Sequence, residues 1–206
     1  MKPTIKAVIL DIDDTLYLER DYVKSGFTAV GQAIGLPEFG AYCWQLFQEG
    51  IRGNTFDLAR SKFELSHHTS ELVRLYREHR PNIQLCPDAR AFIESASQRL
   101  AVVSDGPLHS QRAKYQALGL VPWIECPIFT QEIGAPKPSQ CAFQLAAWTL
   151  QVPYEACVYI ADNPNKDFAG PKALGMHTIR MRRAGGLHEA VPSGCDIDEE
   201  WTRFEV

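Results

Sequence analysis

Four groups of polar residues each follow a short apolar segment, and their side chains are types that can bind or transfer charged groups. The first group contains three acids, Asp11, Asp13 and Asp14, with Thr15 directly after them. Neighbouring carboxylates repel one another, and beside an apolar core the cost can reach several kcal/mol. Either these acids are well exposed, or something with positive charge compensates them.

The other three groups supply a hydroxyl, a lysine and two further acids. They are Ser104–Asp105–Gly106, Lys137 in GAPKPS, and Asp162 with Asp167. Taken singly, each has an ordinary explanation, because an acid after a strand is commonly a helix cap or a turn residue and a loop lysine is commonly solvated. Together they indicate a site, provided that the fold brings all four groups to one place.

Short apolar segments rich in β-branched residues precede these groups and predict buried strands. The predicted strands are 5–10, 100–104, 127–130, 157–161 and 177–181. Helical patterns lie between them at 88–99, 108–118, 138–150 and 166–174. This alternation predicts an α/β fold with a doubly wound, Rossmann-like parallel sheet. Ligands of such sheets bind beyond the carboxyl ends of the strands, where all four polar groups would lie.

The interval 17–82 breaks the alternation because it contains no convincing strand. Helices are predicted there at 20–34, 38–49, 54–65 and 69–79. We therefore expect a small all-helical domain over 17–82, inserted into an α/β core formed by 1–16 and 83–206. No pattern places the acidic and aromatic C-terminal tail.

Composition argues against several classes of partner. The chain has 206 residues, a formal net charge of −4 and no apolar run near the roughly 18–20 residues that span a bilayer. We expect neither a membrane nor a nucleic acid as partner. The N-terminal segment reaches an acid too early for a secretory signal, and the six cysteines form no CxxC pair. Reduced thiols and a cytoplasmic location are the resulting expectations.

The order of the four polar groups resembles that of the haloacid dehalogenase superfamily of phosphohydrolases. DIDDT at 11–15 matches the first motif of that family, and Ser104 in VVSDGP matches the second. Lys137 in GAPKPS matches the third, and ADNPNKD at 161–167 matches the acidic fourth, with Ala161 where glycine is usual. The predicted helical insert also stands where the family carries a helical cap.

This resemblance implies a Mg²⁺-dependent phosphatase that hydrolyses a small phosphorylated metabolite through an aspartyl-phosphate. Asp11 would be the nucleophile, and Asp13 would act as acid and then as base. The cation would be bound by Asp11, by the backbone carbonyl of Asp13 and by Asp162, and its charge would relieve the crowding of acids. Because neighbouring acids and burial disfavour charge, we expect the pKa of Asp13 to be raised.

The remaining motif residues receive supporting roles from the same resemblance. Ser104, Lys137 and the backbone N–H groups at Asp105 and Gly106 would bind the phosphoryl oxygens. Asp167 would orient Lys137 or a metal-bound water.

Residues close to the first motif and in the insert receive weaker assignments. Thr15 would position the loop of the first motif, and Asp14 would stabilise the turn in that loop. Candidate substrate contacts are Tyr17, Arg20 and Arg52, with Lys24, His67 and His68 behind them, although basic residues on amphipathic helices are more often solvated.

Three alternatives stay open at this point. A phosphotransferase or phosphomutase of the same superfamily would use the same residues and shield the aspartyl-phosphate from water. A receiver-like phospho-acceptor domain also combines acids, a hydroxyl and a lysine, although it places its phosphorylated acid after a middle strand. An inactive family member that acts as a binding partner is the third. The presence of Asp13 argues against the dehalogenase branch, which lacks that acid.

Overall fold

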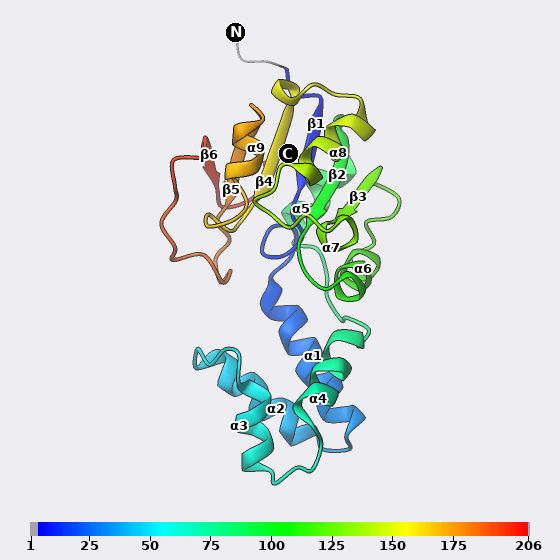
Figure 1. Ribbon diagram of the computed structural model, residues 1–206, viewed down its shortest axis with the longest axis vertical. Coiled ribbons are helices and arrows are strands. Elements are labelled where there is room, and N and C mark those ends of the chain that lie inside the picture. Colours follow the sequence, from blue (N-terminus) through cyan, green and yellow to red (C-terminus); the bar gives the residue numbers. More distant parts are fainter. Residues whose placement is uncertain (1–3, 206) are drawn as a thin grey trace. The chain divides into compact units, whose positions relative to one another are not determined.

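The computed structural model, which describes residues 4–205, contains a six-stranded parallel sheet (Figure 1). The strands are β1 (Ala7–Leu10), β2 (Arg99–Ser104), β3 (Cys126–Phe129), β4 (Cys157–Ala161), β5 (His177–Met181) and β6 (Glu199–Trp201). Their order in the sheet is β3-β2-β1-β4-β5-β6. The predicted α/β class with a doubly wound parallel sheet is confirmed.

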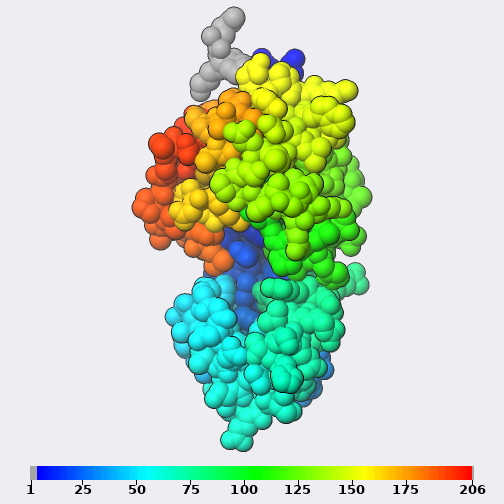
Figure 2. All heavy atoms as spheres, in the orientation of Figure 1, coloured from blue at the N-terminus to red at the C-terminus, as the bar shows by residue number. Residues whose placement is uncertain are grey.

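Strand β1 is the central strand, and its sequence AVIL suits that place. All four residues are buried, as expected where helices cover both faces of a parallel sheet. Its neighbours are β2 and β4, with Leu10 opposite Val102 and Ile160. On the face drawn in Figure 2, segments coloured green to orange make up most of the visible surface of this part of the molecule. The chain runs outward from β1 to β3 and then returns to β4, so the switch point of the sheet lies between β1 and β4.

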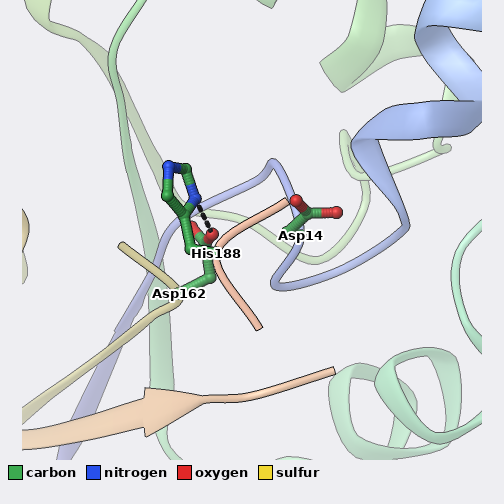
Figure 3. A group of neighbouring side chains, drawn as sticks. All are labelled: Asp14, Asp162 and His188. Atoms are coloured by element: carbon green, nitrogen blue, oxygen red, sulfur yellow. Dashed lines mark hydrogen bonds and ion pairs between the residues drawn. The ribbon is translucent and has the colours of Figure 1, made fainter. Parts of the chain in front are cut away.

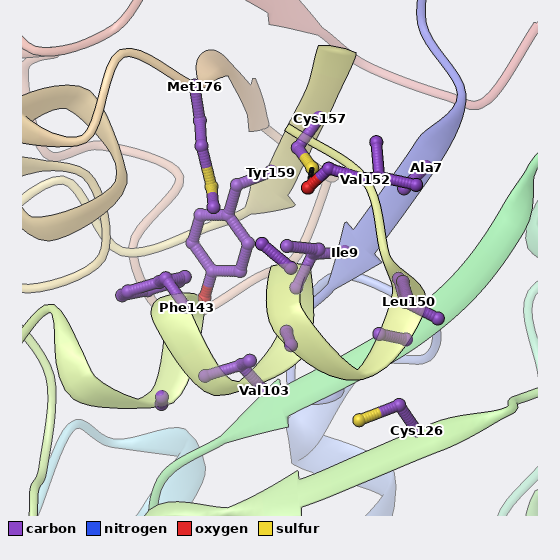
Figure 4. Close-up of a cluster of buried hydrophobic side chains, with 14 of the residues drawn as sticks. Ala7, Ile9, Val103, Cys126, Phe143, Leu150, Val152, Cys157, Tyr159 and Met176 are labelled. Atoms are coloured by element: carbon purple, nitrogen blue, oxygen red, sulfur yellow. Dashed lines mark hydrogen bonds between the residues drawn. The ribbon is translucent and has the colours of Figure 1, made fainter. Parts of the chain in front are cut away.

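The helices that accompany the sheet are α5 (Pro87–Ser95), α6 (Leu108–Ala117), α7 (Thr130–Ile133), α8 (Cys141–Leu150) and α9 (Ala169–Ala173). Helix α8 places an apolar face against the sheet, where Phe143 and Leu150 join Ile9 and Tyr159 in one buried cluster (Figure 4). Complete burial of each such side chain contributes about 1.5–3 kcal/mol.

A second compact unit, Arg20–Ile83, is helical, whereas the first unit contains the chain up to Glu19 and from Gln84 onward. The four helices in this part of the chain are α1 (Glu19–Ala33), α2 (Pro37–Gln48), α3 (Thr55–Lys62) and α4 (Thr69–Glu78). Buried positions recur at helical spacing, for example Val23, Phe27 and Val30 in α1. We call Arg20–Ile83 the helical unit and the remainder the core unit.

Several predicted elements have different bounds in the structure. The helix predicted over 88–99 ends at Ser95, because the chain must become extended to enter β2 at Arg99. The helix predicted over 166–174 begins only at Ala169, because Asp167 accepts a hydrogen bond from the Asn163 N–H and holds the preceding turn.

Other elements begin at different residues or were not predicted. The helix predicted over 138–150 begins at Cys141, and the strand predicted over 127–130 gives its last residue to the short helix α7. The unplaced tail supplies the edge strand β6. Among the described residues, no helix is long and apolar enough to cross a bilayer.

Candidate active site

The carboxyl ends of β1 and β4 bring three distant acids together. The Asp11 N–H donates to the carbonyl of Ile160 at 2.9 Å, which fixes Asp11 at the switch point. Carboxylate oxygens of Asp11, Asp162 and Asp167 lie within 4.8 Å of one another, and all three residues are buried. The structure therefore gathers the first and fourth sequence groups into one cluster.

Lys137 enters this cluster from the loop after α7. Its Nζ lies 3.2 Å from Oδ1 of Asp11 and 2.7 Å from Oδ1 of Asp167, and Nζ donates to the Tyr159 hydroxyl at 3.1 Å. Burial alone would lower the pKa of Lys137, but the charges of Asp11 and Asp167 outweigh it and hold the pKa well above its ordinary value. Lys137 is therefore a buried cation placed beside Asp11.

Three clustered carboxyl groups face the single positive charge of Lys137, and ionising all of them is unfavourable without a further cation. Burial raises the pKa of Asp11 to about 7, against the opposing charge of Lys137. Burial also raises the pKa of Asp162, against a hydrogen bond from His188. Clustered carboxylate oxygens with unbalanced charge are the donor set that a hard divalent cation prefers. The residues present therefore fit a Mg²⁺ site.

Asp13 lies in a different electrostatic environment from Asp11. Lys114 Nζ is 2.7 Å from each of its carboxylate oxygens. Gln111 Nε2 donates to Oδ2 at 3.2 Å, and the Tyr17 hydroxyl donates to Oδ1. Burial would raise the pKa of Asp13, but Lys114 and these hydrogen bonds lower it below the ordinary value. The expectation of a raised pKa is wrong, because it took no account of a lysine of α6 whose ammonium group contacts this carboxylate.

The end of β2 contributes the second sequence group. Ser104 is buried, and its hydroxyl donates to Oε1 of Gln111 at 3.1 Å. The Asp105 side chain accepts hydrogen bonds from Thr130 Oγ1 at 2.5 Å and from the Lys137 N–H at 3.2 Å. These contacts stabilise the loop that carries Lys137. Gly106 has a φ of +134°, a conformation that favours glycine.

The loop after β5 contributes further contacts to the acidic residues, through Leu187 and His188. His188 Nδ1 lies 2.8 Å from Oδ2 of Asp162, and Figure 3 shows the imidazole turned toward that carboxylate. The Leu187 N–H donates to Oδ2 of Asp14 at 2.7 Å. The buried Arg180 donates to the carbonyls of Asp162 and His188, at 3.2 and 2.7 Å. This loop thus fixes both Asp14 and Asp162.

The supporting and substrate residues expected from the sequence have varied surroundings. Thr15 is fully buried, and its Oγ1 has no hydrogen-bond partner among the described residues. Tyr17 is also fully buried, with its hydroxyl on Asp13. Within the helical unit, the Arg20 guanidinium lies 5.7 Å from the Trp44 ring centre. Arg52 donates to the carbonyls of Phe47 and Ile51, at 2.6 and 3.0 Å, which occupies part of its donor capacity.

Sequence reasoning missed three polar side chains of this site: Gln111, Lys114 and His188. A signal for the first two was present, because α6 lacks a clear apolar face and instead buries Ser110, Gln111, Lys114 and Tyr115. Polar residues at the core-facing positions of an amphipathic helix are a departure that often marks function. His188 lies in an irregular loop, where no periodicity could identify it.

Comparison with known proteins identifies the family. A family model described as haloacid dehalogenase-like hydrolase matches residues 5–175. The chain belongs to this family of hydrolases, and the predicted membership of the family is confirmed.

Named relatives and solved structures agree with this assignment. A glyceraldehyde 3-phosphate phosphatase of Methanopyrus kandleri is 28% identical, over 98% of this chain and 93% of that protein. A phosphoserine phosphatase of Thermus thermophilus is 29% identical, but its match spans 55% of this chain and only 47% of that protein. The magnesium-bound structure of the putative HAD-hydrolase YfnB from Bacillus subtilis has a TM-score of 0.72 at 18% identity, covering 97% of this chain and 95% of that one, and shows the shared fold.

Proposed function

We propose that this protein is a Mg²⁺-dependent phosphatase that hydrolyses a small phosphate monoester through an aspartyl-phosphate on Asp11. The observation that carries the proposal is the convergence of Asp11, Asp162 and Lys137 at the switch point of the sheet. Relatives named as phosphatases of glyceraldehyde 3-phosphate and phosphoserine support a small metabolite as substrate. A cytoplasmic location stays a prediction.

Asp11 is the nucleophile in this proposal. One of its carboxylate oxygens attacks phosphorus while the bond from phosphorus to the leaving oxygen breaks. Ser104, Lys137 and the backbone N–H groups at Asp105 and Gly106 bind the phosphoryl oxygens, and such prearranged donors typically contribute a few kcal/mol each in the transition state. Asp167 holds Lys137 at 2.7 Å in the orientation that this role requires.

Asp13 moves the proton in both half-reactions. It gives a proton to the leaving oxygen, and it later takes one from the water that attacks the phosphorus of the aspartyl-phosphate. In that step the bond from phosphorus to the Asp11 oxygen breaks, which releases inorganic phosphate and the free Asp11 carboxylate. The proton taken from water is the one available for the next leaving group. The lowered pKa of Asp13 favours its carboxylate form, which suits the second half-reaction.

Mg²⁺ would be held by the carboxylates of Asp11 and Asp162 and by the backbone carbonyl of Asp13. When bound, it supplies positive charge that draws the phosphate oxygens toward Asp11. We also propose that 17–82 serves as a cap domain for a core of 1–16 and 83–206.

The test is phosphate release from para-nitrophenyl phosphate, with Mg²⁺ and with EDTA. We expect release only with Mg²⁺, and a protein mass increase from the bound phosphoryl group in a rapid acid quench. Both signals should be lost in Asp11→Asn. Absence of metal-dependent release from a broad panel of phosphate monoesters would overturn the proposal. Stoichiometric phosphoryl transfer to an acceptor, with little free phosphate, would instead establish the phosphotransferase alternative.

A further inference from the structure

Helix α6 presents two polar side chains to Asp13 from positions three residues apart on one helix face. Gln111 and Lys114 are each buried, with 3% of their surface exposed. Burying a lysine is costly unless a partner of opposite charge compensates it, and Lys114 Nζ meets both oxygens of Asp13 at 2.7 Å. Apolar residues in place of both partners of a buried ion pair often give equal or greater stability, so stability alone does not account for this pair.

Gln111 connects two groups that the proposed reaction uses in different ways. Its Oε1 accepts from Ser104 at 3.1 Å, while its Nε2 donates to Asp13 at 3.2 Å. The Asp13 carboxylate fixes the orientation of the amide, because it only accepts and therefore faces the amide nitrogen. The Ser104 hydroxyl, which can donate or accept, then donates to the amide oxygen. A phosphoryl-binding hydroxyl and the proton-transfer carboxylate are thereby held in one hydrogen-bonded chain.

Gly106 leaves the space that the Gln111 amide occupies between Ser104 and Asp13. A Cβ at this position would lie 2.6 Å from Nε2 of Gln111, well inside van der Waals contact. The absence of a side chain at the end of β2 therefore serves the Gln111 amide in addition to the backbone turn.

Resting on the proposed phosphatase function, we propose that Lys114 and Gln111 are positioning residues that hold the Asp13 carboxyl group in the orientation from which it transfers a proton to the leaving oxygen. Both oxygens of Asp13 are engaged by donors, on one side by Tyr17 and Lys114 and on the other by Lys114 and Gln111. Rotation of the carboxyl group would break several of these contacts at once. Proton transfer depends on such placement, because donor and acceptor must come within hydrogen-bond distance.

Leaving-group dependence distinguishes this role from a structural one. The ratio kcat/KM includes the steps up to departure of the leaving group. Nitrophenolate departs readily without a proton, whereas an alkoxide needs one, so loss of a well-placed acid affects alkyl phosphates more than aryl phosphates. A general loss of structure would lower kcat/KM for both substrates alike.

The experiment compares kcat/KM of the full chain with Mg²⁺ for para-nitrophenyl phosphate and for the alkyl phosphate that the wild type hydrolyses best among glycerol 3-phosphate, glyceraldehyde 3-phosphate and phosphoserine. In Lys114→Met we expect a loss of about tenfold to a hundredfold for the alkyl phosphate, and of less than about threefold for the aryl phosphate. Lys114→Arg, which keeps the cation, should recover part of the alkyl activity. Lys172→Met is the matched control, because it removes a lysine paired with Asp198 in the same unit, and it should leave the ratio unchanged.

Gln111→Leu keeps the test decisive if Lys114→Met does not fold. It should show the same selective loss, at about threefold to tenfold for the alkyl phosphate. Adding Lys114→Met to Asp13→Asn should cause no further selective loss if the lysine acts through Asp13. Equal losses for both substrates, or an unchanged ratio, would overturn the positioning role while leaving the phosphatase intact. A wild type inactive on every substrate would instead refute the proposed function, and this inference with it.

Discussion

The interior of the helical unit and a group of charged residues at the strand ends of the core unit are both buried, but they contain opposite kinds of side chain. We call this second group, Asp11, Lys137, Asp162 and Asp167, the strand-end cluster. In the helical unit, Phe27 meets Phe56 edge to face at 5.6 Å, and Phe39 stacks on Phe56 at 6.3 Å. In the core unit, the buried Lys137 lies between Asp11 and Asp167. Burial by itself therefore says little about stability until the chemistry of the buried groups is known.

Apolar burial and charge burial have opposite energetic signs. Removing aromatic surface from water stabilises the fold, and edge-to-face aromatic pairs add about 0.5–1.5 kcal/mol each. Removing carboxylates from water costs free energy that their ion pairs offset only in part. We infer that the strand-end cluster is retained for chemistry, whereas the aromatic interior supplies stability. Substitutions in the two regions should then affect different measurements.

Asp11→Asn should produce the largest effect, and it should appear in the rate. Loss of the nucleophile is expected to lower kcat by about ten thousandfold or more. Thermal stability should stay equal or rise, because burial already raises the pKa of Asp11 to about 7 and a neutral amide avoids the cost of the buried charge. Steady-state kinetics and calorimetry on the same preparation measure both quantities.

Glu94→Gln is the control for this substitution, since Glu94 forms an exposed ion pair with Arg90 on α5. It should change neither kcat nor the melting temperature appreciably. If Asp11→Asn instead lowered the free energy of unfolding by several kcal/mol, the strand-end cluster would be a stabilising element and the contrast between the two regions would fail.

Phe39→Ala should have the next largest effect, and it should appear in stability. The side chain is fully buried in the aromatic cluster, and such truncations typically cost about 3–5 kcal/mol. Urea denaturation followed by far-ultraviolet circular dichroism measures this loss. A change below about 1 kcal/mol would show that the cluster repacks freely and contributes little.

Gly40→Ala should have a smaller effect on the same unit. A Cβ there would lie 2.3 Å from the carbonyl oxygen of Phe27, so α1 and α2 approach closely only because this position lacks a side chain. We expect a loss of about 1–3 kcal/mol, as is typical when a packed contact is overfilled. Gly194→Ala is the matched control, because no atom lies within 4 Å of its added Cβ, and unfolding curves of the two variants should separate clearly.

Sequence patterns predicted the α/β class and the meeting of the four motif groups because both depend on local periodicity and on where strands end. Asp11 and Asp162 each follow a buried apolar strand, and parallel strands bring such positions to one edge. The bounds of α5 and α9 were less predictable, since α5 ends where the chain becomes extended to enter β2 and a turn hydrogen bond delays the start of α9. The edge strand β6 was missed because its three residues, EEW, carry no alternating apolar pattern.

Within the site, sequence alone could not indicate which buried charge faces which. Asp11 and Asp13 stand two residues apart, yet the pKa of Asp11 is raised and that of Asp13 is lowered. The lowered pKa of Asp13 comes first from Lys114 and then from hydrogen bonds of Tyr17 and Gln111. Lys114 is distant in sequence, and its helix was predicted without assigning its side chains any role in the site. Pairing of this kind depends on three-dimensional packing and has no sequence signal comparable to periodicity.

The smallest predicted effect concerns Asp88, whose ionic contacts lie outside the strand-end cluster. Asp88 accepts from Arg183 Nη1 at 3.1 Å and from the Phe204 N–H at 2.8 Å, and so joins α5 to the C-terminal tail. Burial would raise the pKa of Asp88, but these hydrogen bonds outweigh it and lower the pKa below the ordinary value. Here, unlike at Asp11, the charged form is the stabilised one.

Because the folded state lowers the pKa of Asp88, its ionised form stabilises the fold above the unfolded value near pH 4. That contribution is lost as the pH falls through the folded value, since the carboxylate is then protonated in both states. Asp88→Asn should therefore cost about 1 kcal/mol at pH 7, a low figure for a charge-assisted contact because the carboxylate is partly exposed. The difference between wild type and variant should shrink progressively below about pH 4. Urea denaturation from pH 7 to pH 3 measures it, and a difference that stayed constant over this range would mean that the charge of Asp88 contributes nothing and that its contacts act only through shape.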